Sequence, residues 1–313
     1  MAEKKQISGM DDGVNDNRDY TAQVETTYNA LHVKSHMFGY DGVAGFTNPV
    51  NANSNGQLFV TNPALQIATG ELTGITYVHK FGSAPNFDTG DLLVTIWDGA
   101  DDAFIDAMNL TYSTTADIDT ISSSDNSDTQ LIEIQGLDAN WNLVKQTKTL
   151  TGTTEATLDT PLLRVFRMKN LGATDNAGHI YVYVNDISVG GVPALSTDVR
   201  AIMQPGNNQT LMASYTIPNG KKGYLTSFYA GNNGAKKSSD YEIELRLRPT
   251  GGVFQIKHLS SLFEDGISQW NYMYQVPEPL AAKTDIEMRG QALTAAITEA
   301  TLAAGFDLIL VDD

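Results

Sequence analysis

Short segments of β-forming residues, separated by turn signals, recur along most of this chain and constrain its fold more than any other feature. In residues 241–248, four apolar side chains alternate with four charged ones. Because successive side chains of a strand point to opposite faces, this pattern predicts a strand with one buried face. Residues 131–138 and 142–150 predict a hairpin, since the segment from Asp138 to Trp141 between them carries turn-forming residues.

Many other segments have the same character. They are residues 74–81, 92–97, 162–168, 179–184, 210–217, 224–231, 254–258, 270–276, 284–289 and 306–311. The last of them is almost entirely apolar, which favours a central position in its sheet. Residues 291–304 are rich in Ala and Leu, and we expect a loop or a helical turn there. The predicted fold class is therefore all-β, with two antiparallel β-sandwich domains of jelly-roll-like type preceded by an extended arm.

The first 60 residues differ from the rest of the chain, because their apolar side chains are scattered among polar residues and turn signals. We expect residues 1–60 to form an extended N-terminal arm. A β-sandwich domain then follows at residues 61–195, and a second, jelly-roll-like one at residues 196–313. The apolar side chains of the arm either grip a neighbouring subunit or cover the protein's own β-domain. The candidate partner-binding residues are Tyr28, Leu31, His32, Met37, Phe38 and Tyr40.

The formal net charge of −17 limits the partners of the chain. A surface of this sign repels phosphate backbones and anionic lipids, so we expect neither nucleic acid nor a membrane as a partner. No run approaches the roughly 18 apolar residues that span a bilayer. No apolar stretch follows the first residues, so no signal peptide is expected. The absence of cysteine excludes disulfides, zinc–thiolate sites and cysteine nucleophiles.

The sequence contains no recognisable active-site motif. Phosphate-binding, nucleophile-elbow and zinc-protease signatures are absent, so we predict no catalytic residue, no cofactor and no metal ligand. His32 and His36 have a spacing that could bind a metal on a helix, but their segment does not predict a helix. The acidic clusters at residues 98–102 and 125–128 lack the full pattern of a calcium loop and suit turns.

Several segments resemble structural proteins of tailed-bacteriophage virions. Residues 29–42 (NALHVKSHMFGYDG) are similar to a segment near the start of virion-associated proteins. Residues 134–141 (IQGLDANW) with 150–154 (LTGTT) resemble a core segment of phage structural proteins, and residues 209–218 (QTLMASYTIP) and 304–312 (AGFDLILVD) are similar to the same group. The resemblance covers most of residues 29–313. These are packing and turn motifs, so the family contributes no active-site residues.

The resemblance implies a role in particle architecture, in a protein assembled in the host cytoplasm and released by lysis. The leading expectation is a capsid cement or decoration protein that binds the major capsid protein or other virion proteins. A homo-oligomer is expected, with a trimer favoured. One alternative is a tail fibre or tail adaptor, although no repeat or coiled coil predicts a shaft. Another is a carbohydrate-binding or carbohydrate-cleaving sandwich, although Trp97, Trp141 and Trp270 lie beside apolar residues and suit packing better than a sugar platform.

Overall fold

The computed structural model describes residues 63–87, 93–100, 109–185, 187–233, 240–263, 268–293 and 300–313, together with the pairs 38–39 and 48–49. The chain divides into two units, Met1–Asn62 and Pro63–Asp313. The described residues of the first unit are two short strands, β1 (Phe38–Gly39) and β2 (Asn48–Pro49), which pair in antiparallel fashion.

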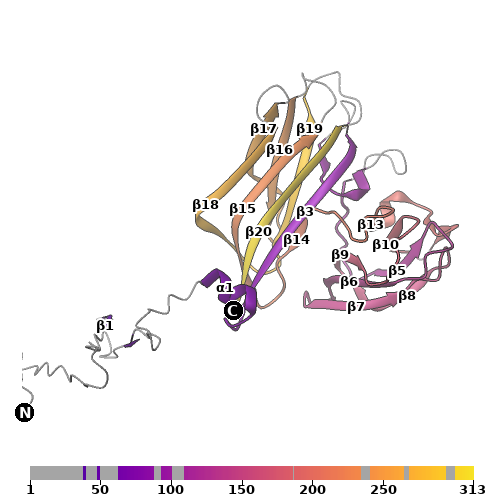
Figure 1. The fold of residues 1–313 in the computed structure, drawn as a ribbon, viewed down its shortest axis with the longest axis horizontal. Coiled ribbons are helices and arrows are strands. Elements are labelled where there is room, and N and C mark those ends of the chain that lie inside the picture. Colours follow the sequence, from indigo (N-terminus) through magenta and orange to yellow (C-terminus); the bar gives the residue numbers. More distant parts are fainter. Residues whose placement is uncertain are drawn as a thin grey trace, which may run out of the picture. The chain divides into compact units, whose positions relative to one another are not determined.

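A β-sandwich of two antiparallel sheets makes up much of the second unit (Figure 1). One sheet has the order β18 (Gln269–Leu280), β15 (Lys221–Asn233), β20 (Ala300–Asp312) and β3 (Ile75–Phe87). The other has the order β14 (Ser214–Thr216), β19 (Asp285–Ala292), β16 (Asp240–Arg248) and β17 (Gln255–Phe263), and β4 (Val94–Thr95) also pairs with β19. Strands β17 and β18 are therefore edge strands.

Alternating apolar residues fill the space between the two sheets. In β16 the four apolar residues predicted to face inward are all buried, which confirms that prediction: Tyr241, Ile243, Leu245 and Leu247. In β20 the buried set is Leu302, Ala304, Phe306, Leu308 and Leu310. The sheets approach closely, since a Cβ added at Gly290 of β19 would lie 2.6 Å from Leu302 Cδ1. Burial of these faces is the main stabilising contribution to the sandwich.

Residues 118–203 form a smaller lobe, again of two antiparallel sheets. One has the order β13 (Val199–Met203), β10 (Ile180–Tyr183), β5 (Ile118–Ser123) and β8 (Ala156–Leu162). The other has the order β7 (Leu143–Thr149), β6 (Leu131–Leu137) and β9 (Arg164–Asn170), and a further short pair is β11 (Ser188–Val189) with β12 (Val192–Pro193). The hairpin of β6 and β7 confirms the prediction for residues 131–150. The all-β prediction is confirmed as well.

The smaller lobe is inserted between strands of the sandwich. Strands β3 and β4 precede the lobe in the sequence, whereas β14 to β20 follow it. Figure 1 shows β3, in purple, beside the yellow C-terminal strand β20. Strands β3 and β4 lie within residues 61–195, the predicted first domain. They pair with β20 and β19, which lie within residues 196–313, the predicted second domain. We call residues 118–203 the inserted lobe.

The C-terminal stretch differs in part from its prediction. Strand β20 lies between β15 and β3, which confirms the expected central position. The expected loop or helical turn at residues 291–304 is wrong at both ends, because residues 291–292 belong to β19 and 300–304 to β20; residues 294–299 lie outside the described part. The small side chains there serve close packing, since a Cβ at Gly305 would lie 2.4 Å from Tyr229 Oη. Burial in the sheet outweighs the helix propensity of Ala and Leu.

Three short helical turns complete the described part of the unit. They are α1 (Pro63–Thr69) and the 3₁₀ turns η1 (Asp98–Ala100) and η2 (Ser196–Asp198). The sequence did not predict α1, whose first residue is a proline, a residue often found at the first helical position. No helix in the described residues is long and apolar enough to cross a membrane.

Candidate functional site

The two edge strands at one side of the sandwich expose large apolar side chains. These side chains are 45–80% exposed, and they are Ile256, Leu259 and Phe263 of β17 with Met273 and Val276 of β18. Single exposed apolar residues are common on protein surfaces. A long edge strand that carries several of them is different, because its free backbone groups and apolar side chains together favour pairing with another chain. We call these five residues the apolar edge.

The apolar edge is electrically neutral. Strands β17 and β18 contain one Lys and one Glu apart from His258, and Lys257 Nζ donates to Glu278 Oε1 over 2.5 Å. The two prolines of β18, Pro277 and Pro279, have no N–H to donate. Strand β17 has no proline and pairs with β16 alone among the described strands. The backbone edge open to a partner is therefore that of β17.

A cluster of aromatic rings beneath the edge holds β17 and β18 together. His258 of β17 contacts Tyr272 of β18 with ring centroids 4.8 Å apart, and both rings contact Phe228 of β15 at 4.6 and 5.4 Å. Tyr274 meets Tyr272 edge to face at 5.0 Å. Burial raises the pKa of Tyr274 to about 12, so its hydroxyl stays neutral. The edge is therefore a firmly packed surface, which lowers the entropy lost when a partner binds.

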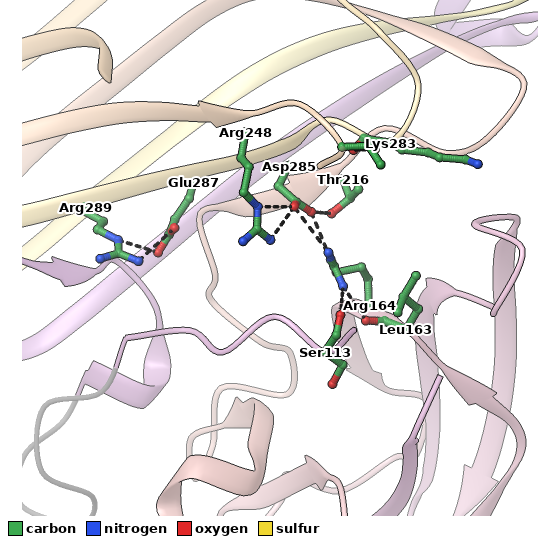
Figure 2. A network of polar contacts seen from close by, with 10 residues as sticks. Ser113, Leu163, Arg164, Thr216, Arg248, Lys283, Asp285, Glu287 and Arg289 are labelled. Carbon is green, nitrogen blue, oxygen red and sulfur yellow. Dashed lines mark hydrogen bonds and ion pairs between the residues drawn. The ribbon is translucent and has the colours of Figure 1, made fainter. Parts of the chain in front are cut away.

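A buried ionic clamp joins the inserted lobe to the sandwich (Figure 2). Asp285 of β19 accepts hydrogen bonds from Arg164 Nε of β9 at 3.0 Å and from Arg248 Nη2 of β16 at 2.6 Å. Thr216 Oγ1 donates to the same carboxylate at 2.6 Å. Arg164 Nη1 donates to the carbonyl oxygens of Ser113 and Leu163, at 2.7 and 2.9 Å. Such complete hydrogen bonding is what allows charges to be buried.

Aromatic rings alternate with the guanidinium groups of the clamp. The guanidinium of Arg164 lies 5.0 Å from the ring centroids of both Tyr112 and Trp141. That of Arg248 lies 4.5 Å from the rings of Tyr112 and Phe254. Each contact is a cation–π arrangement, which is stronger when water is excluded. The clamp therefore fixes the inserted lobe on the sandwich, and its ion pairs and cation–π contacts have a structural role.

The polar cluster around Asp307, on the outer face of β20, resembles a catalytic arrangement only in composition. Tyr77 Oη and Ser227 Oγ each donate to Asp307 at 2.5 Å, and His79 Nδ1 lies 2.7 Å from the same carboxylate. Burial alone would raise the pKa of Asp307, but these hydrogen bonds outweigh it and lower the pKa. A serine nucleophile needs a hydrogen bond to the histidine, whereas Ser227 and His79 both contact the aspartate. The cluster links β3, β20 and β15.

The acidic clusters singled out in the sequence act in turns. The N–H and hydroxyl of Ser127 donate to Asp125 Oδ1 at 2.8 and 2.6 Å, and these bonds lower the pKa of Asp125. Asp128 is buried and accepts hydrogen bonds from Ser123 Oγ and from the N–H of Gly178. Asp98 accepts from the N–H of Leu211 at 2.8 Å, and residues 101–102 lie outside the described part. Nowhere in the described ranges do three potential ligands gather around a metal position.

The predicted arm residues can be placed only in part. Phe38 belongs to β1, while Tyr28, Leu31, His32, Met37 and Tyr40 lie outside the described residues, as does His36. Their role stays a prediction. The tryptophans pack against the core as expected, with Trp97 fully buried and Trp141 and Trp270 partly buried.

Sequence reasoning missed both the apolar edge and the clamp. The apolar residues of β17 and β18 were treated as strand markers, because a sequence does not show which strand ends a sheet. Arg164 stands alone within the apolar run from Leu162 to Phe166, and that isolation was an available sign of a buried ion pair. Its partner Asp285 is 121 residues away, so no local pattern could have identified it.

Comparisons with known proteins give little further information. No family model matches the chain, and no curated protein matches its sequence. Among solved structures, the chain is weakly similar to the infectious bursal disease virus VP2 subviral particle, with 10% identity and a TM-score of 0.19 over 77% of this chain and 72% of that one. The structure of the Gx strain of that virus gives 10% identity and a TM-score of 0.20 over 76% and 75%. Scores this low do not establish a shared fold.

Proposed function

We propose that this protein is a non-enzymatic structural subunit of a virus particle, which associates with copies of itself through the apolar edge. The observation that carries the proposal is the exposed apolar surface of the open edge strand β17 and its neighbour β18. The clamp at Asp285 supports it, because a building block of a shell needs its two lobes held in a fixed arrangement.

The partner that binds the apolar edge is a second copy of the chain. The chain carries a net charge of −17, so most of its surface repels another copy. The edge strands are the exception, because the charges of Lys257 and Glu278 cancel within one subunit. Two copies can therefore meet there without like-charge repulsion. Closed assembly of such copies hides the free strand edges, and a trimer is the expected state.

The more specific role that we propose is capsid cement or decoration in a tailed bacteriophage. Its support is the resemblance of the quoted segments to phage virion proteins. Residues 1–60 then bind the major capsid protein or a neighbouring virion protein, and the β-structure forms the body. The alternative is a place in the tail, and the copy number in the particle distinguishes a cement protein from a tail protein.

Analytical ultracentrifugation of the full chain tests the self-association. The wild-type chain should form an oligomer, and Leu259→Lys should weaken its association at least tenfold, because the new charge loses hydration at the interface. Leu195→Lys is the matched control, since Leu195 is 59% exposed, compared with 49% for Leu259, and lies next to η2 instead of at the edge. A wild-type monomer at all concentrations, or equal weakening by both variants, contradicts the proposed interface.

A further inference from the structure

A cavity of about 330 Å³ lies between the unpaired side of β3 and the inserted lobe. Six successive residues of β3, from Thr76 to Phe81, form one wall. Residues of the inserted lobe line the cavity as well, and they are Gln135, Leu143, Phe166 and Arg167. Among the described strands only β20 pairs with β3, so β3 ends its sheet. The volume falls in the range of about 300–1,000 Å³ that is usual for small-molecule sites.

The charged residues of the cavity are all cationic or histidine. Lys80, Arg167 and Lys221 line it together with His79, and no Asp or Glu of the described residues does. His79 and Lys221 have carboxylate partners just outside the lining, Asp307 and Asp312. Lys80 and Arg167 have none among the described residues. Lys80 Nζ donates to the carbonyl oxygen of Phe166, and Arg167 Nη2 donates to Gln209 Oε1 at 2.6 Å.

This pair differs from the arginines of the clamp and from Arg289, each of which contacts a carboxylate. The arginines of the clamp contact Asp285, and Arg289 Nε donates to Glu287 Oε1 at 2.8 Å. Lys80 is as buried as the clamp residue Arg164, both being 8% exposed, yet among the described residues the charge that lies beside it is a second cation, Arg167. Burial and the charge of Arg167 lower the pKa of Lys80 to about 7. A buried ammonium without a counter-charge is unfavourable, and an anion in the cavity removes that penalty.

We infer that this cavity binds a small organic anion, whose carboxylate or phosphate group contacts Lys80 and Arg167. The rest of the lining suits a polar molecule of about the size of one sugar. Gln209 and Thr210 offer hydrogen-bonding groups, and the rings of Tyr77 and Phe166 offer flat apolar surface. A single anionic group can accept hydrogen bonds from both cations, since a carboxylate or phosphate has several acceptor oxygens. The site is separate from the apolar edge, so neither proposal depends on the other.

Isothermal titration calorimetry on the full chain tests this site. Inorganic phosphate and galacturonate are the anionic probes, and neutral galactose is the matched control ligand. Near pH 6, below the pKa of Lys80, at least one of the two anions should bind saturably, while galactose should give no saturable signal. Binding of phosphate alone or of galacturonate alone identifies the preferred group, and either outcome supports the site.

Substitutions then locate the binding. Lys80→Met keeps the length of the side chain and removes the charge, and Arg167→Gln keeps a hydrogen-bonding group; each should weaken anion binding at least tenfold. Lys148→Met is the matched control, because Lys148 pairs with the exposed Asp159 and neither of the two residues lines the cavity. Affinity should also fall as the pH rises through about 7, where Lys80 loses its proton. Absence of saturable binding for both anions, or unchanged binding by Lys80→Met, overturns the inference.

Discussion

Replacing Asp285 with alanine should destabilise the protein by about 3–5 kcal/mol, because removing one partner of a buried ion pair leaves an uncompensated charge. Here two charges are left, on Arg164 and Arg248, and the carboxylate side chain that joins them is only 4% exposed. The substitution also removes the acceptor for Thr216 Oγ1. At about 2–4 °C per kcal/mol for a domain of 150–250 residues, the melting temperature should fall by about 6–20 °C.

Thermal unfolding followed by circular dichroism measures this loss, and Asp159→Ala is its control. Asp159 also pairs with a basic residue, Lys148 Nζ at 2.9 Å, but its side chain is 73% exposed. Exposed ion pairs contribute about 0–1 kcal/mol, so this variant should melt close to the wild type. Equal melting temperatures for Asp285→Ala and Asp159→Ala would refute the reasoning that the clamp is a buried, structural ion pair.

Three further outcomes are expected. Lys80→Met should stabilise the protein by a few kcal/mol below about pH 7, and this gain should shrink as the pH rises toward 10.5. The reason is that the unfolded wild-type chain binds more protons than the folded one between these pH values, so wild-type stability rises with pH. Denaturant unfolding at several pH values measures the gain, and a gain that is constant with pH contradicts the prediction. Gly136→Ala should cost about 1–3 kcal/mol in urea unfolding, since its Cβ would lie 2.1 Å from Arg164 O, whereas Gly231→Ala, with 3.6 Å to its nearest atom, should not. Deleting residues 1–60 should leave the unfolding of Pro63–Asp313 unchanged and abolish binding to particles; full binding by the truncated chain excludes the arm as the attachment.

Local patterns were sufficient to locate most strands. The alternation in residues 241–248 fixes both the strand β16 and its buried face, because the two-residue period of a strand is visible in the sequence. The turn beginning at Asp138 could be recognised as well, since Asp138 Oδ1 accepts the N–H groups of Asn140 and Asn142 at 2.8 and 2.9 Å. Such hydrogen bonds depend on neighbouring residues alone.

The pairing of strands could not be predicted in the same way. Strand β3 pairs with β20, for example Val78 with Leu308, across more than 200 residues. A strand of mixed composition fits several neighbours equally well, so the inserted lobe is invisible in the sequence. Within the predicted strand at residues 92–97, the described residues form β4 at Val94–Thr95 and an isolated bridge between Trp97 and Met212, while residue 92 lies outside the described part.

The candidate sites were hidden for a related reason. The sequence does not distinguish an apolar residue of an edge strand from one of a central strand, as the exposed Leu259 and the buried Leu245 illustrate. Lys80 carried a weak signal, since it occupies the inward-facing position between Val78 and Gly82 in an alternating strand. That position predicts a buried side chain, but only the fold shows that Arg167 lies beside it and that no carboxylate of the described residues does.

The copy number of this chain in purified particles is the direct test of the proposal that it is a structural component of a virus particle. Quantitative mass spectrometry against the major capsid protein gives the ratio. A capsid cement predicts a ratio near one to one, or one chain per few capsid subunits, and a dozen or fewer chains per particle would place it in the tail. Complete absence from the particles would contradict a structural role in them.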